Sequence, residues 1–214
     1  EAFLQISEIV GEEHIGWRYD PIFIDDKYTV KYHLEQFEGI SAALQGYTKN
    51  CVISFLDLYQ KVKRNFPEVK MVSKEQRKYL GQRMTRIATE HKMILRPCGE
   101  GTELAAFGAD CNGCMTQQIY ENAIHMSLDM PKKQFLRKEC ACYLGNDIGA
   151  YNSCPHMCKY CYANYDEKSV RLNRINHNPK SAFLIGNDMP NDKVHKAVQK
   201  SWINGQISLN GFFI

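Results

Sequence analysis

Three cysteines follow one another closely in the segment Cys154-Pro-His-Met-Cys158-Lys-Tyr-Cys161. Cysteine thiolates are the usual ligands of iron–sulfur clusters, and a [4Fe–4S] cube takes four of them when it is saturated. Three cysteines on one tight loop can each reach a different iron, which leaves the fourth iron free for a small molecule. The spacing C-x-x-x-C-x-x-C therefore predicts a [4Fe–4S] cluster held by Cys154, Cys158 and Cys161.

An aromatic residue, Tyr160, stands directly before the third cysteine. With it, the segment resembles the motif C-x-x-x-C-x-aromatic-C of radical S-adenosylmethionine (SAM) enzymes. In those enzymes the open iron chelates the amino and carboxylate groups of SAM, and the aromatic side chain packs near the adenine. The resemblance implies SAM as a second cofactor, Tyr160 as one of its contacts, and an electron donor as a partner.

Two other roles for the same loop stay open. Zinc also accepts thiolates, and His156 could join them, although the common zinc knuckle pairs two C-x-x-C motifs. Alternatively, an iron–sulfur cluster could serve electron transfer or sensing without SAM. Elemental analysis separates iron with sulfide from zinc without it.

A second set of cysteines precedes the loop, and it offers five thiols for at most four ligand positions. These thiols could hold a second cluster or a zinc ion, or one of them could complete the first cluster. The set consists of Cys98, the Cys111-Asn-Gly-Cys114 pair and Cys140-Ala-Cys142.

The remaining cysteine, Cys51, lies inside an apolar segment, where we expect it to be a small buried hydrophobic residue. It brings the total to nine, and an odd count in a chain of 214 residues argues against a secreted disulfide scaffold. Closely spaced cysteines in such a chain favour metal binding and a cytoplasmic location.

The elements that must position these residues alternate between helix and strand. Thr29 is placed to cap a helix, and Ser73 with Gln76 has the pattern of a capping box. The order predicts parallel β/α units with helices covering a sheet. The predicted elements are a helix over 2–10, a strand over 15–24, a helix from 29 to about 45, a strand over 51–56, a helix from 73, and a strand over 93–95.

Four polar residues fall at the carboxyl ends of the predicted strands, namely Arg18, Asp20, Ser54 and Glu100. Parallel sheets place their chemistry at this edge, so the four are candidates to orient SAM or a substrate. Charged groups beside an apolar strand must be paired or line a wet cavity. The alternative is therefore an internal Arg18–Asp20 pair that only stabilises the sheet edge.

Taken together, the motifs resemble an uncharacterised bacterial family, the domain-of-unknown-function family numbered eighteen forty-eight. Its members carry a radical-SAM-like cysteine cluster at the carboxyl end and are usually longer at the N-terminus. The resemblance implies a partial (β/α) barrel similar to radical SAM barrels over residues 1–137, without its first strands, and an irregular cysteine-rich iron–sulfur segment over 138–214. The segments that carry it are Trp17–Ile22, Ile53–Phe55, Cys98–Glu100, Cys140–Cys142, Asp147–Tyr151, Cys154–Asn164, Ser181–Gly186 and Gln206–Leu209.

After residue 100 the sequence becomes rich in Gly, Asn, Asp and Cys. Helices are predicted only near 116–128 and 191–203. Such a segment has too little apolar content to fold by hydrophobic burial alone, and a bound metal centre can supply the missing free energy.

Composition and charge exclude several classes. With 44% hydrophobic and 24% charged residues, the chain is typical of a globular protein, and no apolar run is long enough to cross a membrane. The net charge is +3, but residues 60–96 carry eleven basic and three acidic side chains. This stretch is interpreted as a solvated helix face. Our leading prediction is an iron–sulfur protein, which is a radical SAM-like enzyme if SAM binds. The alternative is a zinc-stabilised module that binds nucleic acid through this basic stretch.

Overall fold

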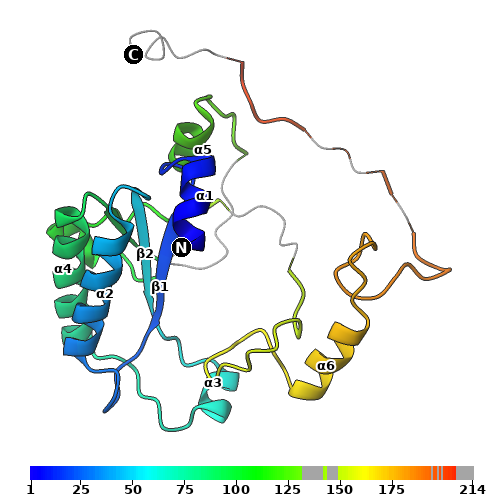
Figure 1. The fold of residues 1–214 in the computed structure, drawn as a ribbon, viewed down its shortest axis with the longest axis horizontal. Helices are drawn as coiled ribbons and strands as arrows, with labels where there is room; N and C mark the ends of the chain where they lie inside the picture. The colour runs from blue at the N-terminus through cyan, green and yellow to red at the C-terminus, as the bar shows by residue number, and fades with distance from the viewer. Residues whose placement is uncertain (132–141, 144–148, 194, 197, 199, 206–214) are drawn as a thin grey trace. The chain divides into compact units, whose positions relative to one another are not determined.

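The chain, analysed as a computed structural model, divides into two compact units (Figure 1). Unit 1 consists of Glu1–Leu56, Lys70–Leu144 and Trp202–Ile214, and unit 2 of Asp57–Val69 and Gly145–Ser201. The structure describes residues 1–131, 142–143, 149–193, 195–196, 198 and 200–205. The domain boundary predicted near residue 138 lies outside these residues and stays a prediction.

A parallel sheet of three strands forms the centre of unit 1. Its strands are β1 (Gly16–Ile22), β2 (Asn50–Phe55) and β3 (Ile94–Pro97), in the spatial order β1-β2-β3. All three are parallel, which confirms the predicted α/β class. Among the described residues no further strand closes the sheet, so the predicted barrel is not shown. A closed β/α barrel needs about eight strands, and this part of the chain supplies only three of them.

Two helices of unit 1 begin at the residues that the sequence predicts as their N-terminal caps. Helix α2 (Val30–Leu44) follows Thr29, whose hydroxyl oxygen accepts a hydrogen bond from the Tyr32 N–H at 3.1 Å. Helix α4 (Lys74–Glu90) starts with the predicted capping box, in which Ser73 and Gln76 exchange hydrogen bonds. Figure 1 shows α2 and α4 side by side along the sheet. Both helices contribute buried side chains to the core, such as Phe37 of α2 and Leu80 of α4.

The core of unit 1 also engages α1 (Ala2–Val10), whose Phe3 and Leu4 pack against it. Cys51 of β2 is fully buried within this core, as predicted. Other members of the core come from the strands and from α2 and α4, and include Trp17, Ile22, Phe37, Ile53, Leu80, Met84 and Leu95.

Two short elements follow β3 in unit 1. They are the 3-10 helix η1 (Glu103–Phe107) and α5 (Gln117–Ile124), and the latter confirms the helix predicted near 116–128. Gly81 of α4 allows η1 to approach closely, because a Cβ atom there would come within 2.5 Å of the Leu104 methyl groups.

Unit 2 contains α3 (Gln60–Asn65) and α6 (Glu167–Ile175), neither of which the sequence predicted. Its buried apolar residues among those described are few: Val62, Phe66, Val69 and Val170. The predicted helix over 191–203 is wrong for the described residues, which are irregular there. The segment follows Pro190 and has few apolar side chains with which to pack a helix.

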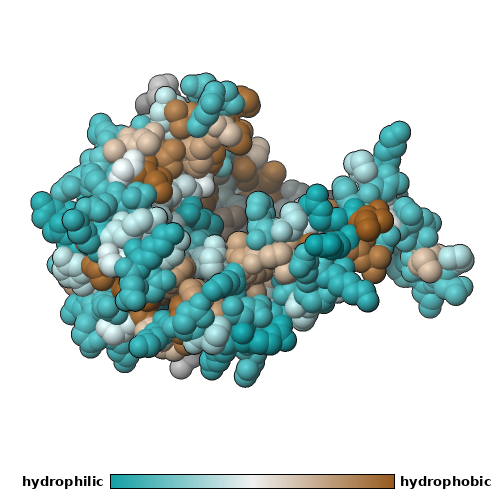
Figure 2. Space-filling view, turned by 60° about the horizontal axis from the view of Figure 1, so that its bottom comes forward, coloured by the Kyte–Doolittle hydropathy of each residue, from teal (hydrophilic) through white to brown (hydrophobic). Residues whose placement is uncertain are grey.

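The surface is mainly hydrophilic on the face shown in Figure 2. The basic stretch 60–96 is divided between the units, because α3 belongs to unit 2 and α4 to unit 1. On α4 the side chains of Lys74, Lys78, Arg83 and Arg86 are exposed, in agreement with a solvated helix face. None of the helices in the described part of the chain is both long and apolar enough to cross a membrane.

The capping box makes a testable contribution to stability. We expect Ser73→Ala to lower the free energy of unfolding by about 1 kcal/mol, because the Gln76 N–H loses its acceptor. Urea unfolding followed by circular dichroism measures the change. Ser73→Asp is the matched control and should keep most of the stability, since Asp also caps helices. An unchanged midpoint in Ser73→Ala would contradict the assigned role.

Candidate metal centre

The predicted ligand loop, residues 154–161, lies in unit 2 and is closed at its base by hydrogen bonds. Asn164 donates from Nδ2 to the Cys154 carbonyl oxygen at 2.7 Å. The backbone of Asn152 bonds the Ala163 carbonyl at 3.1 Å, and its side chain accepts from the Tyr165 N–H. These contacts hold both ends of the loop together, so all three cysteines are presented by one short closed segment.

Inside the loop the backbone turns sharply. Met157 has a positive φ of 52°, an uncommon conformation for a residue other than glycine. The Cys161 N–H donates to the Cys158 carbonyl oxygen at 2.9 Å, which closes a turn between the second and third cysteines. The turn keeps Cys158 and Cys161 near one another despite the two residues between them.

The three thiols are free and accessible to different degrees. Cys154 and Cys158 are exposed, and Cys161 is half-buried. Among the described residues no three His, Cys, Asp or Glu side chains are arranged to hold a metal ion. Gathering these thiols around a cluster would therefore require side-chain rotation between staggered positions. His156, the candidate zinc ligand, is exposed on the same loop.

A lysine from another part of unit 2 contacts the loop region. Lys61 of α3 donates from Nζ to the Tyr162 carbonyl oxygen at 2.6 Å. The same ammonium lies 3.4 Å from the centre of the Tyr165 ring and 5.7 Å from that of Tyr151, so it makes cation–π contacts. Sequence reasoning missed Lys61, because nothing in the sequence links residue 61 to residues a hundred positions later.

A second lysine ties the loop itself to the segment after α3. Lys159 forms an ion pair with Glu68 at 2.8 Å and lies 5.2 Å from the centre of the Phe66 ring. Both side chains of the ion pair are exposed, so the pair contributes little to stability. Its effect is to connect the ligand loop to the segment that follows α3. Tyr160, the predicted adenine contact, is half-buried in this unit.

The second set of cysteines is brought together only in part, and in unit 1. The Cys114 and Cys142 sulfurs lie 3.4 Å apart, and Cys114 also interacts with Cys98. The neighbouring thiols and burial raise the pKa of Cys114, because closely spaced thiolates repel one another. Three of the five predicted thiols, those of Cys98, Cys114 and Cys142, therefore lie close together in unit 1.

The other two members of that set stand apart from this group or outside the described structure. Cys111 packs against the core, and burial raises the pKa of its thiol. Cys140 lies outside the described residues. Of the C-x-x-C pair, Cys114 interacts with the other two thiols, whereas Cys111 packs against the core.

At the carboxyl edge of the sheet, Arg18 and Asp20 form the ion pair that the sequence suggested. Arg18 Nη2 lies 2.6 Å from Asp20 Oδ2, and the Ser54 hydroxyl donates to the same oxygen at 3.3 Å. Burial alone would lower the pKa of Arg18, but the hydrogen bonds to Asp20 and Cys98 and the charges of these groups together raise it above its usual value. Arg18 therefore remains charged and connects the sheet edge to the thiols.

Glu100, the last of the predicted cofactor contacts, has partners within the protein. One carboxylate oxygen accepts the Phe55 N–H at 2.8 Å, and the other pairs with Arg77 at 2.9 Å. These bonds join β2, the loop after β3 and α4. The candidate cofactor residues are thus divided, with Tyr160 in unit 2 and Arg18, Asp20, Ser54 and Glu100 in unit 1.

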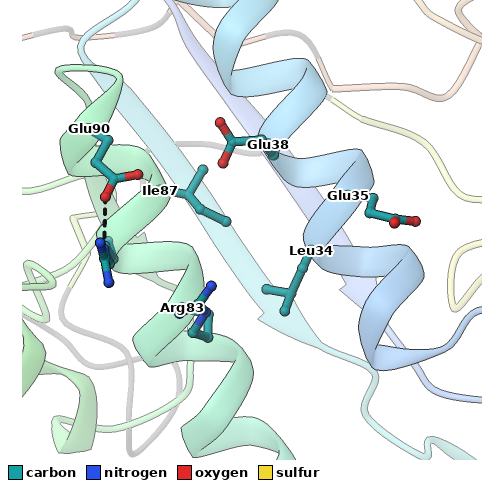
Figure 3. Close-up of a pocket in the computed structure, with 7 residues that line it drawn as sticks. Leu34, Glu35, Glu38, Arg83, Ile87 and Glu90 are labelled. Carbon is teal, nitrogen blue, oxygen red and sulfur yellow. Dashed lines mark hydrogen bonds and ion pairs between the residues drawn. The ribbon is translucent and has the colours of Figure 1, made fainter.

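A surface groove of ≈ 320 Å³ lies between α2 and α4, but it contains no cysteine (Figure 3). Leu34 and Ile87 lie between the two helices in this view. The charged residues around them form solvated pairs, such as Arg86 with Glu90 at 2.8 Å. The groove therefore offers no chemistry that competes with the thiol sites.

Comparison with known proteins connects the geometry to a family. Over residues 1–163 the sequence matches the family described as Domain of unknown function (DUF1848). The chain belongs to this family. No curated protein and no solved structure matches it.

The DUF1848 match confirms the resemblance that the motifs suggested, and it ends just beyond the ligand loop. All nine cysteines lie within it. Helix α6 and the tail segments Ser181–Gly186 and Gln206–Leu209 lie after it.

The different surroundings of the thiols predict different reactivities. In the metal-free, reduced chain we expect iodoacetamide to alkylate Cys154 and Cys158 first, because both are exposed. Cys51 should react only after unfolding, since it is buried and burial raises its pKa. Peptide mass spectrometry over a time course measures each rate. Labelling of Cys51 as fast as Cys154 in the folded chain would contradict the structure.

Proposed function

We propose that this DUF1848 protein is an iron–sulfur protein in which Cys154, Cys158 and Cys161 ligate a [4Fe–4S] cluster. The observation that carries the proposal is the hydrogen-bonded loop that presents all three thiols at the spacing C-x-x-x-C-x-x-C. Three unevenly spaced cysteines on one loop are not the usual arrangement for zinc, because zinc knuckles combine two pairs of ligands.

The packing of unit 2 supports a bound group at this loop. The unit buries few apolar side chains in its described part, so ligand binding to the native state would add stability that hydrophobic burial does not provide. Asn164 is buried, and its Oδ1 has no hydrogen-bond partner among the described residues. A buried acceptor of this kind is satisfied when a water or a ligand donates to it.

The charges around the loop also support the binding of an anionic cluster. Three thiolates on a cluster give the site negative character, and this is favourable near the ammonium group of Lys61. Lys61 is held by the Tyr162 carbonyl oxygen, one residue after Cys161, whereas the charge of Lys159 is offset by Glu68. The residues present therefore suit an anionic thiolate centre.

The finer proposal is a radical SAM-like enzyme acting on a substrate that the sequence does not name. A reduced cluster with one free iron supplies an electron for the cleavage of SAM, as in the enzymes that share this motif. In this chain the loop supplies three ligands, which leaves that iron open unless another thiol occupies it. Tyr160, directly before Cys161, would offer an aromatic face to the adenine.

The sheet of unit 1 suits the fold expected with such chemistry. Its parallel strands and covering helices are compatible with a segment of a β/α barrel, which we propose as the family fold. Arg18, Asp20 and Ser54 lie at the carboxyl edge, where barrels place their ligands. We propose this network as a contact region for substrate or SAM.

The nucleic-acid-binding alternative finds less support in the fold. It relied on the basic side chains of residues 60–96, which the solvated face of α4 also explains. On α4 one of the exposed arginines, Arg86, is paired with an acidic neighbour. A cluster used only for electron transfer or sensing remains the second candidate, because the closed loop serves it equally well.

Cluster binding has a direct spectroscopic test. Chain reconstituted with iron and sulfide under anaerobic conditions should show broad absorbance at about 400 nm, the region of thiolate–iron charge transfer. Changing Cys154, Cys158 or Cys161 to Ala should remove most of the iron, whereas Cys51→Ala, the matched control, should keep it. Retention of iron in all three loop variants, or zinc without sulfide in the native protein, would refute the proposal.

SAM chemistry is tested on the same material. With dithionite as reductant, we expect the cluster-loaded chain to convert SAM to methionine and 5′-deoxyadenosine, quantified by chromatography. Addition of SAM should also change the electron paramagnetic resonance signal of the reduced cluster. An intact cluster with neither effect would assign the protein to electron transfer or sensing.

A further inference from the structure

We propose that Cys98, Cys114 and Cys142 form a second metal site in unit 1, which binds one thiophilic divalent ion of the zinc class. The site is independent of the loop cysteines and of the chemistry proposed for them. It is built from three segments far apart in the sequence, whose thiols meet beside Arg18.

Backbone contacts, rather than the sulfurs alone, place each thiol. The Cys98 N–H donates to the Ile53 carbonyl oxygen at 2.8 Å, which fixes Cys98 at the carboxyl end of the sheet. The Tyr143 N–H donates to the Met115 carbonyl oxygen at 2.7 Å, and this bond sets Cys142 next to Cys114. The site is therefore part of the folded framework of unit 1.

The backbone directly before Cys114 also has a specific conformation. Gly113 has a φ of 118°, a conformation that side-chain-bearing residues rarely adopt, and it turns the backbone directly before Cys114. The Cys114 N–H then points to the Cys142 sulfur, at 3.3 Å. This hydrogen bond fixes the position of the Cys142 sulfur next to Cys114.

The distance between the Cys114 and Cys142 sulfurs favours a single metal ion over a [4Fe–4S] cluster. Thiolates about 2.3 Å from a tetrahedral zinc ion lie about 3.8 Å from one another. The Cys114 and Cys142 sulfurs, at 3.4 Å, are close to this separation. As the side chains stand, no three such groups in the described residues enclose an ion, so binding would rotate at least one thiol.

Arg18 completes the charge balance. A dipositive ion with three thiolates has one net negative charge, and the Arg18 guanidinium beside the thiols offsets it. Arg18 Nη1 lies 3.9 Å from the Cys114 sulfur, and its side chain also bonds Cys98. Arginine is suited to this position because it stays charged and donates in several directions.

The experiment maps protection of each thiol in the full chain. Reduced protein is treated with a chelator, incubated with or without zinc chloride, and alkylated, and each cysteine peptide is quantified by mass spectrometry. Zinc should slow the alkylation of the half-buried Cys98 and Cys114 most, and that of Cys142, which is already buried in the metal-free chain, to a smaller extent. Equal alkylation of these three with and without zinc, or a Cys114–Cys142 disulfide that forms in place of protection, would overturn the proposal.

Two cysteine variants test which of the five thiols of the second set form the site. Cys114→Ala should abolish zinc protection of Cys98 and Cys142, whereas Cys111→Ala, its partner in the C-x-x-C pair, should leave that protection intact. The reverse pattern would overturn the assignment. If Cys114→Ala does not fold, as judged by circular dichroism, the protection pattern of the unmodified chain decides. Loss of the loop cluster does not affect this readout, because the loop peptides are scored separately.

Discussion

Burial of apolar surface, the main driving force of folding, is unevenly divided between the two units. Unit 1 packs its sheet, α2 and α4 around a continuous core. Unit 2 has only Val62, Phe66, Val69 and Val170 buried among its described residues, and polar contacts of Asn152 and Asn164 close its ligand loop. With so few apolar side chains buried in its described part, unit 2 gains less from apolar burial than unit 1 does.

The cysteines show how surroundings decide the role of one side chain. Cys51 sits within β2 and serves as a small hydrophobic residue, and Cys111 packs against the same core. Cys114 and Cys142 lie next to one another near Arg18, with Cys142 buried, whereas Cys154 and Cys158 are open to solvent. Accessible thiols beside a cation are the more reactive ones, and thiols within apolar packing are inert.

Local signals in the sequence predicted much of unit 1, whereas long-range contacts were not predictable. Thr29 and Ser73 mark helix starts because capping involves residues only three positions apart. The helix α3 and the contact of Lys61 with the Tyr162 carbonyl oxygen depend on tertiary packing, and so does which members of the second cysteine set come together. The C-x-x-x-C-x-x-C loop was recognisable because all its information is local.

The carboxyl edge of the sheet joins two features that the sequence treated separately. Arg18 was expected either to pair with Asp20 or to line a cavity, and it does pair with Asp20. The same guanidinium also faces the thiols of Cys98 and Cys114, so its charge is shared between a carboxylate and sulfur. Because Asp20 already accepts from Arg18 and Ser54, an anion or metal arriving at this edge would meet a preset hydrogen-bond network. Arg18 therefore connects the thiols of Cys98 and Cys114 with the Asp20 carboxylate through one side chain.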